Sequence, residues 1–168
     1  NHLIQLGHRK IAYIGETERE NRYRGYLDAL SAENITVYKG YVSNVTLSSE
    51  GGYLGAKKLL EQNCDATAYF CPNDMTAIGA MRAIQEAGYS IPGDISIISI
   101  DDIETAQYLN PMLTTVHIPI EEMGQMAAKT LIDRIEGGHS LPMKINLPFY
   151  IANRESCGPA HPLRQREE

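Results

Sequence analysis

The stretch SIISIDDIE, residues Ser96–Glu104, decides which fold we expect for this sequence. Its first five residues are apolar or small without alternation, which is typical of a strand buried on both faces of a parallel sheet. Asp101 and Asp102 follow directly. An ionised carboxylate at the end of a buried strand loses hydration, so it needs a partner that uses its charge. The stretch therefore predicts a buried strand that delivers at least one acid to a site.

Strand-like runs alternate with stretches of helical period before this point. Apolar residues three and four positions apart predict the helices. The expected strands are Lys10–Ile14, Ile35–Val42, Ala66–Cys71 and Ile95–Ile100. The expected helices are centred on Tyr23–Leu30, Tyr53–Leu60 and Met75–Ile84. Because the strands are continuously apolar, the predicted fold class is α/β, a doubly wound parallel sheet with helices on both faces.

The pattern changes after the fourth strand and the loop that follows it. Thr114–Ile118 is expected to be extended, and Pro119 opens a helix that ends at Gly137-Gly138. The apolar stripe of this helix consists of Ile120, Met123, Ala127, Leu131 and Ile135. A last strand is expected at Lys144–Tyr150, where an internal proline indicates an edge strand or a bulge.

The composition is that of a soluble globular protein, with 43% hydrophobic and 21% charged residues among 168. No apolar run approaches the roughly 20 residues that cross a bilayer, so no membrane partner is expected. The net charge is −6, and no Lys/Arg cluster interleaves with aromatic residues, so these residues alone do not predict a nucleic-acid surface.

The cysteines and the first residues bear on location. Three cysteines without C-x-x-C spacing favour reduced thiols in a cytoplasmic protein, without a zinc site. They are Cys64, Cys71 and Cys157. The first residues lack the features of a signal peptide and open in mid-pattern, which we interpret as a fragment of a longer chain.

Polar side chains follow the expected strands at the edge where open parallel sheets bind ligands. Arg22 follows the first strand, Asn73 and Asp74 follow the third, and Asp101 follows the fourth. A guanidinium, an amide and a carboxylate together donate to and accept from neighbouring hydroxyl groups. This edge of the sheet is therefore predicted to bind a ligand rich in hydroxyl groups.

Each of these residues also has a purely structural interpretation. Asn73-Asp74 is typical of an N-cap pair, and Arg22 could pair with Glu16 or Glu18 on the surface. The Asp101-Asp102 pair could cap the following loop. The histidines are scattered and are interpreted as surface or structural residues; they are His2, His8, His117, His139 and His161.

Two classes of enzyme would use the same acids. Phosphotransfer receiver modules hold Mg²⁺ with paired aspartates on the first strand, whereas here the pair follows the fourth. A hydrolase would need a nucleophile elbow or a metal set, but G-x-S-x-G, H-E-x-x-H and G-x-x-x-x-G-K-[ST] are absent. Catalysis, a metal centre and a cofactor are therefore not expected.

Four stretches resemble the effector-binding core of the lactose/galactose-repressor (LacI/GalR) family. They are LGHRKIAYIG, RYRGYLDAL, CPNDMTAIGAMRAIQEAGYSIPGDISIISIDD and NPMLTTVHIPIEEMGQMAAKTLIDRI, in the family's order and spacing. The resemblance implies a two-lobed core of the type I periplasmic-binding-protein-like fold, with a small effector, usually a sugar, between the lobes. It also implies a homodimer that binds operator DNA through an N-terminal helix-turn-helix, which is absent from these residues.

The resemblance divides the chain between the lobes. Residues 1–113 correspond to the C-terminal lobe, and residues 114–140 to a crossover and a helix of the N-terminal lobe. Residues 141–155 correspond to a return strand of the C-terminal lobe. Residues 156–168 are a tail. From Gly158 on, this tail is polar, contains proline and is expected to fray.

The resemblance also assigns site residues. Arg22 matches the family's hydroxyl-binding arginine, Asn73 its site asparagine and Asp101 its site aspartate. Leu47 falls where many members place an aromatic ring, and Ile118 falls where relatives often have glutamine. These two departures bear on which ligand is bound. Asp102 is expected to be structural, and the dimer interface implied by the resemblance includes Met75, Ile78, Arg82 and Tyr108.

The sequence thus predicts the effector-sensing part of a cytoplasmic, sugar-responsive repressor, with a galactoside suggested by overall likeness. Sugar binding would favour one relative orientation of the lobes and so change the spacing of the DNA-binding heads. The alternative, from another class, is a secreted sugar-binding protein of a transport system, which shares the lobed fold.

Overall fold

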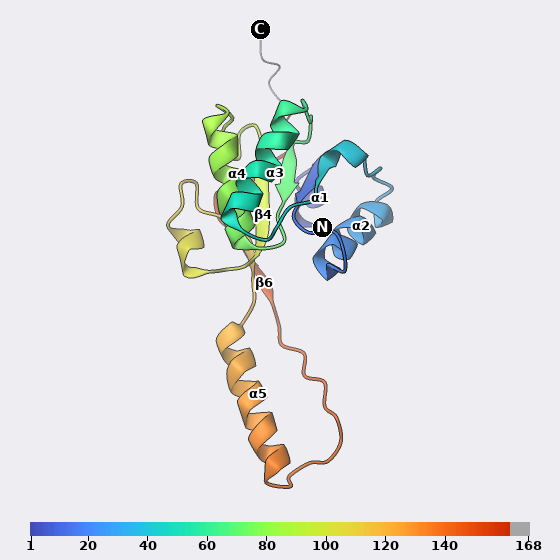
Figure 1. The fold of residues 1–168 in the computed structure, drawn as a ribbon, viewed down its shortest axis with the longest axis vertical. Coiled ribbons are helices and arrows are strands. Elements are labelled where there is room, and N and C mark those ends of the chain that lie inside the picture. Colours follow the sequence, from blue (N-terminus) through green and yellow to red (C-terminus); the bar gives the residue numbers. More distant parts are fainter. Residues whose placement is uncertain (162–168) are drawn as a thin grey trace.

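A six-stranded sheet forms the centre of the structure, a computed structural model that describes residues 1–161 (Figure 1). The strand order is β2-β1-β3-β4-β5-β6. The first five strands are parallel, and β6 pairs with β5 in the antiparallel direction. The strands are β1 Ile11–Ile14, β2 Val42–Ser43, β3 Ala68–Phe70, β4 Ser96–Asp101, β5 Thr114–His117 and β6 Tyr150–Ala152.

Helices cover both faces of the sheet, which confirms the doubly wound α/β fold. Successive strand residues point to opposite faces. In β1, Ile11 and Tyr13 pack with α1 (His2–Gln5) and α2 (Asn21–Ala32) on one face. Ala12 and Ile14 pack on the other face with the helices α3 (Ser49–Glu61) and α4 (Asp74–Glu86). The continuous apolar runs of the sequence therefore reflect strands that are buried on both faces.

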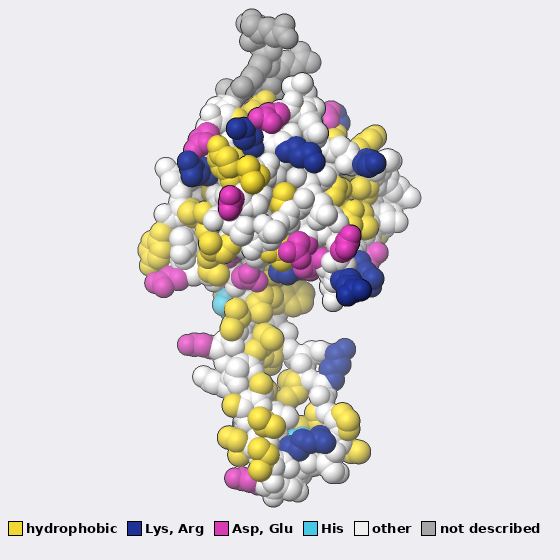
Figure 2. All heavy atoms as spheres, in the orientation of Figure 1, with side chains coloured by type: hydrophobic (Ala, Val, Ile, Leu, Met, Phe, Trp, Pro, Cys, Tyr) yellow, Lys and Arg dark blue, Asp and Glu magenta, His cyan; other side chains and the backbone are white. Residues whose placement is uncertain are grey.

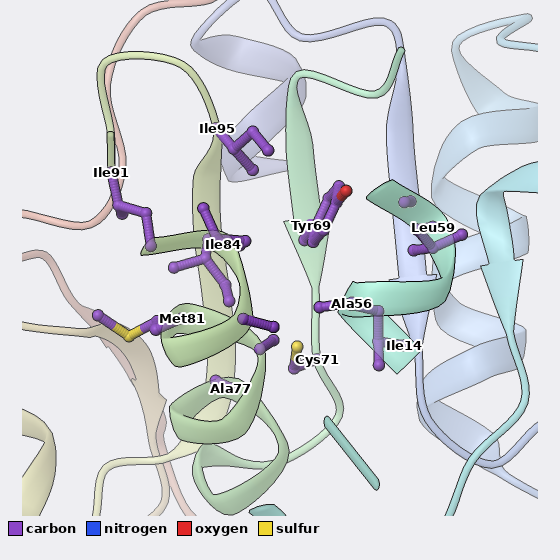
Figure 3. Close-up of a cluster of buried hydrophobic side chains, with 14 of the residues drawn as sticks. Ile14, Ala56, Leu59, Tyr69, Cys71, Ala77, Met81, Ile84, Ile91 and Ile95 are labelled. Carbon is purple, nitrogen blue, oxygen red and sulfur yellow. The ribbon is translucent and has the colours of Figure 1, made fainter. Parts of the chain in front are cut away.

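The larger core lies between the sheet and the pair α3 and α4 (Figure 3). Tyr69, Ile14, Leu59 and Ile84 are among its largest fully buried side chains. The two helices pack with their backbones in contact, because a Cβ added at Gly79 would overlap the backbone carbonyl of Ser49. Only glycine permits so close an approach.

The helix α5 (Ile120–Ile135) stands away from the rest of the structure, beyond the carboxyl edge of the parallel strands (Figure 1). It has no buried residue. Hydrophobic side chains lie exposed along it and along the segment that returns from it (Figure 2). Between α5 and this return segment, residues 141–149, lies an apolar groove of about 860 Å³. The expected helix is confirmed, but its apolar stripe has little to pack against.

Two expected strands are wrong in extent. Of the strand expected at Ile35–Val42, only Val42 is in a strand, because β2 is an edge strand that pairs over two residues. The strand expected at Lys144–Tyr150 begins only at Tyr150. The preceding residues run along α5 with no neighbouring strand to accept their backbone hydrogen bonds, and a proline among them lacks the N–H group.

The short helix α1 was not expected, nor were the 3₁₀ turns Lys39–Tyr41 and Glu104–Gln107. Part of the expected tail is fixed rather than frayed. Ala160 lies in the part expected to fray, but its backbone N–H donates to the carbonyl of Leu6. Ser156, just before that part, is buried. The rest of the expected tail, residues 162–168, lies outside the described residues.

Candidate functional site

The strand order places a crevice between β1 and β3, where the chain first turns to one side of the sheet and then to the other. Ligands of open parallel sheets bind at such a point. The loops that follow the two strands touch there, because a Cβ added at Gly15 would lie 2.5 Å from Pro72 Cγ. The same Cβ would lie 3.2 Å from Leu47 Cδ2. Leu47, predicted at the site, therefore lies at this crevice.

Arg22 lies in the first turn of α2 and reaches across the end of β3. Its Nη1 donates to the carbonyl of Pro72 at 2.7 Å. Its Nε and Nη2 each donate at 2.9 Å to Glu20, the residue that caps α2. This hydrogen-bonded pair raises the pKa of Arg22 and lowers the pKa of Glu20. The expected surface partners, Glu16 and Glu18, are wrong; the partner is Glu20.

Asn73 is the N-cap of α4. Its Oδ1 accepts a hydrogen bond from Thr76 N at 2.9 Å, and its Nδ2 donates to the carbonyl of Leu47 at 3.4 Å. The capping interpretation is therefore confirmed for Asn73, whose amide also faces the crevice loop. Asp74 is not a cap but a fully buried acceptor for Ser99, Thr115 and the backbone of Ile103.

Asp101 ends β4 at this edge, and its carboxylate receives no hydrogen bond from residues 1–161. It is half-buried, with Arg22 and Asp74 close enough to influence its charge. Burial, together with the charge of Asp74, raises its pKa despite the opposing effect of Arg22. Its backbone φ is 124°, and that of Asp102 is 58°. Such conformations cost about 1–3 kcal/mol each in residues other than glycine and gather at functional sites.

Asp102, by contrast, is held by protein groups on both carboxylate oxygens. His117 Nδ1 donates to Oδ2 at 2.8 Å, and Arg154 Nη2 donates to Oδ1 at 2.6 Å. Its side chain is only 11% exposed. The structural interpretation of Asp102 therefore agrees with the structure. Neither partner was predicted, because both lie far from Asp102 in the sequence.

The remaining predicted residues lie outside this cluster. Ile118 follows β5 and lines the apolar groove beside α5. On the outer side of α4, Met75 is exposed and Ile78 is half-buried. Arg82 pairs with Glu86 at 2.7 Å on the same face, and Tyr108 is 73% exposed in the loop after the second 3₁₀ turn.

A cavity of about 290 Å³ lies between α1, α2 and the sheet, and of the predicted site residues only Arg22 lines it. Among residues 1–161, no group of three or more His, Cys, Asp and Glu side chains is placed to hold a metal ion. In the same residues, no helix is long and apolar enough to cross a membrane.

The arrangement matches known proteins across almost the whole chain. Residues 1–157 match the family described as periplasmic binding protein-like domain. The ribose operon repressor of Haemophilus influenzae is 44% identical over 138 residues, 80% of this chain and 42% of that protein. The HTH-type transcriptional repressor PurR of Yersinia enterocolitica is 36% identical over 170 residues, 98% of this chain and 50% of that protein. The chain spans about half the length of these relatives.

Solved structures of transcriptional regulators have the same fold as this chain. A LacI-family transcriptional regulator from Enterococcus faecium with bound ribose superposes with a TM-score of 0.87 at 36% identity, covering 95% of this chain and 61% of that one. Another regulator, CelR in complex with cellobiose, superposes with a TM-score of 0.85 at 31% identity, covering 92% of this chain and 49% of that one.

Proposed function

This chain belongs to the periplasmic-binding-protein-like family, in its lactose/galactose-repressor (LacI/GalR) group, and we propose that it senses a small sugar for a transcriptional repressor. In this proposal residues 1–113 belong to one lobe, and residues 114–140 form the crossover and a helix of the other. Residues 141–155 return to the first lobe, and 156–168 form a tail. The sugar lies between the lobes and favours one of their relative orientations.

The observation that carries the proposal is that the half-buried carboxylate of Asp101 has no hydrogen-bond donor among the described residues. A half-buried carboxylate in a strained backbone has lost hydration and receives no hydrogen bond from the described residues in return. A ligand with neighbouring hydroxyl groups would satisfy both oxygens with charge-assisted hydrogen bonds. Asp101 is therefore the acceptor that we assign to the sugar.

Arg22 and Asn73 supply the complementary donors. The described residues use three of the five N–H groups of Arg22, which leaves two for a ligand. Asn73 retains one amide N–H beyond its bond to Leu47. Leu47 would offer an apolar surface at the crevice. Ile118, beyond β5, would face the ligand from the lobe crossover, where it can offer only van der Waals contact.

The two candidate sugars that we compare are ribose and a galactoside. The 44% identical relative is named for the ribose operon, and the E. faecium regulator is described with bound ribose. These names favour a pentose such as ribose over the galactoside that the sequence suggested. An aliphatic Leu47 in place of an aromatic ring also removes a stacking surface that suits larger pyranosides.

In the whole protein, we propose that sugar binding regulates operator binding by a homodimer. The description of the PurR relative as an HTH-type repressor supports a DNA-binding helix-turn-helix outside these residues. The face of α4 with Met75, Ile78 and Arg82, together with Tyr108, is proposed as the dimer contact. The relatives are named as transcriptional regulators, which supports a cytoplasmic binding protein without a cofactor or catalysis.

Calorimetric titration with ribose and with lactose tests this function. Arg22→Gln should weaken binding of the sugar by about tenfold or more, the value of one charge-assisted hydrogen bond. Arg24→Gln is the matched control, because Arg24 lies on the same helix but is exposed. Binding of neither sugar, or equal losses in both variants, would contradict the proposal. A secreted transport protein would bind sugar and remain monomeric by light scattering, whereas a repressor of this type should be dimeric.

A further inference from the structure

A row of three side chains runs across the edge of the sheet where the chain leaves for α5 and returns from it. Asp101 lies opposite His117 in the register of β4 and β5, and His117 lies opposite Tyr150 in the register of β5 and β6. The rings of His117 and Tyr150 stack with centroids 4.6 Å apart and planes inclined by 22°. Asp101, the residue assigned to bind the sugar, is therefore in register with both segments that connect the sheet to α5.

The residue after Asp101 holds both of these connections. Asp102 accepts one hydrogen bond from His117, the last residue of β5, and one from Arg154, just beyond β6. Because a carboxylate only accepts, the Nδ1 of His117 carries the proton in this contact. Arg154 is fixed in turn, since its Nη1 donates to the carbonyl of Leu113 at 2.8 Å. The largely buried carboxylate of Asp102 thus joins the outgoing and the returning segments.

We call the contacts of Asp102 with His117 and Arg154 the clamp. The backbone links this clamp to Asp101. The two aspartates share one peptide group, and both have φ values in the left-handed region, 124° and 58°. The N–H of Asp102 has only a long contact, 3.3 Å, with Thr115 Oγ1. A change in the backbone of Asp101 therefore also moves the peptide that carries Asp102 and, through it, the contacts of Asp102 with His117 and Arg154.

We propose that Asp102 is a positioning residue that transmits sugar binding at Asp101 to the two connections of α5 by holding His117 and Arg154. This inference rests on the proposed function, because it names how that site would communicate with the rest of the molecule. It assigns Asp102 no contact with the sugar. Its loss should therefore uncouple the connections from the ligand rather than abolish binding.

Asp102→Gly is the informative variant, because glycine adopts a φ of 58° without strain and removes only the clamp. Asn63→Gly is the matched control, since Asn63 has a φ of 53° on the exposed surface. His117→Phe is a second variant that keeps a ring against Tyr150 and removes the nitrogen donor. Hydrogen–deuterium exchange of peptides covering residues 114–119 and 148–154 reports the opening of the two connections.

Without ligand, Asp102→Gly should raise exchange in both peptides by about tenfold or more, and His117→Phe mainly in the first. Asn63→Gly should change neither. With saturating ribose, exchange in the wild-type protein should slow in both peptides. Asp102→Gly should bind ribose within about threefold of the wild-type affinity by calorimetry yet show no such slowing.

The possible outcomes distinguish a failure of the Asp102 clamp from a failure of the proposed sugar-sensing function. Unchanged exchange in ligand-free Asp102→Gly overturns the clamp, and ribose-dependent slowing that persists in this variant overturns its role in transmission. A wild-type protein that binds neither ribose nor lactose overturns the proposed function and the transmission with it. The ligand-free comparison still decides in that case whether Asp102 holds the connections.

Discussion

Replacing Asp101 by asparagine should separate sugar binding from folding, because the carboxylate makes no hydrogen bond within residues 1–161. The substitution keeps the size of the side chain, and asparagine tolerates a positive φ well. A hydrogen bond to a charged group contributes about 1.5–3 kcal/mol, against about 0.5–1.5 kcal/mol for a neutral one. With two hydroxyl groups bound, the loss of charge should cost about 2–3 kcal/mol of affinity, roughly 30-fold to 150-fold.

Stability should move in the opposite direction. Burial and Asp74 raise the pKa of Asp101, so the folded protein binds its proton more tightly than the unfolded chain does. The ionised carboxylate therefore opposes folding near pH 7, and Asp101→Asn should be as stable as the wild type or more stable. This advantage should fade as the pH falls through the raised pKa and below the ordinary value of 3.8, where both states are protonated.

The assays are calorimetric titration with ribose and urea unfolding of the same preparations at several pH values. Asp28→Asn on the exposed side of α2 is the control, and it should change neither quantity. Unchanged sugar affinity in Asp101→Asn would refute the assignment of Asp101 as the residue that binds the sugar. A loss of stability of more than about 2 kcal/mol would instead show that Asp101 supports the fold.

Three further predictions concern the fold. Gly79→Ala should lose more than about 2 kcal/mol of unfolding free energy in urea, because its Cβ overlaps the neighbouring helix, whereas Gly124→Ala, with open space around it, should gain up to about 1 kcal/mol. Burial lowers the pKa of His8 below its ordinary value of 6.5, so stability should be complete above pH 6.5 and decline as the pH falls; His8→Gln should flatten this decline in urea unfolding. The 59% exposed Leu131 lines the groove beside α5, which the described residues leave uncovered, so these 168 residues on their own should self-associate through this groove. Leu131→Lys should reduce that association in sedimentation experiments, and equal association in both proteins would exclude this face.

The sheet was predictable from the sequence because burial on both faces leaves a local trace. Continuous apolar runs marked β1, β3 and β4, and helical periodicity marked α2 to α5. The edge strands left a weaker trace. Ile35 and Val37 are apolar because they pack under α2, not because they pair with a neighbouring strand. Apolar residues beside α5 likewise line a groove without forming the expected strand.

The site was predictable in its composition but not in its internal partners. The strand order brings the candidate residues Arg22, Asn73 and Asp101 to the same edge of the sheet. The bidentate contact of Glu20 with Arg22 could not be predicted, because glutamate is not a favoured N-cap. The contact of Arg154 with Asp102 joins residues far apart in the sequence, and no local pattern marks it.

The question raised by two adjacent acids at the end of a buried strand has a physical answer in their backbone. Both lie in the left-handed region, at a combined cost of about 2–6 kcal/mol if each outlier costs about 1–3 kcal/mol. The ion pair of Asp102 with Arg154, whose side chains are 11% and 19% exposed, and the bond of Asp102 to His117 can offset such a cost. The side chain of Asp101 contributes no hydrogen bond within residues 1–161 that could offset this cost. The strained turn therefore persists because Asp102 holds it, and what it achieves is to present the carboxylate of Asp101, unsatisfied, at the edge of the sheet. If position 101 did not need a carboxylate, nothing in the described residues would account for the strained turn. The interpretation therefore depends on the loss of sugar binding in Asp101→Asn.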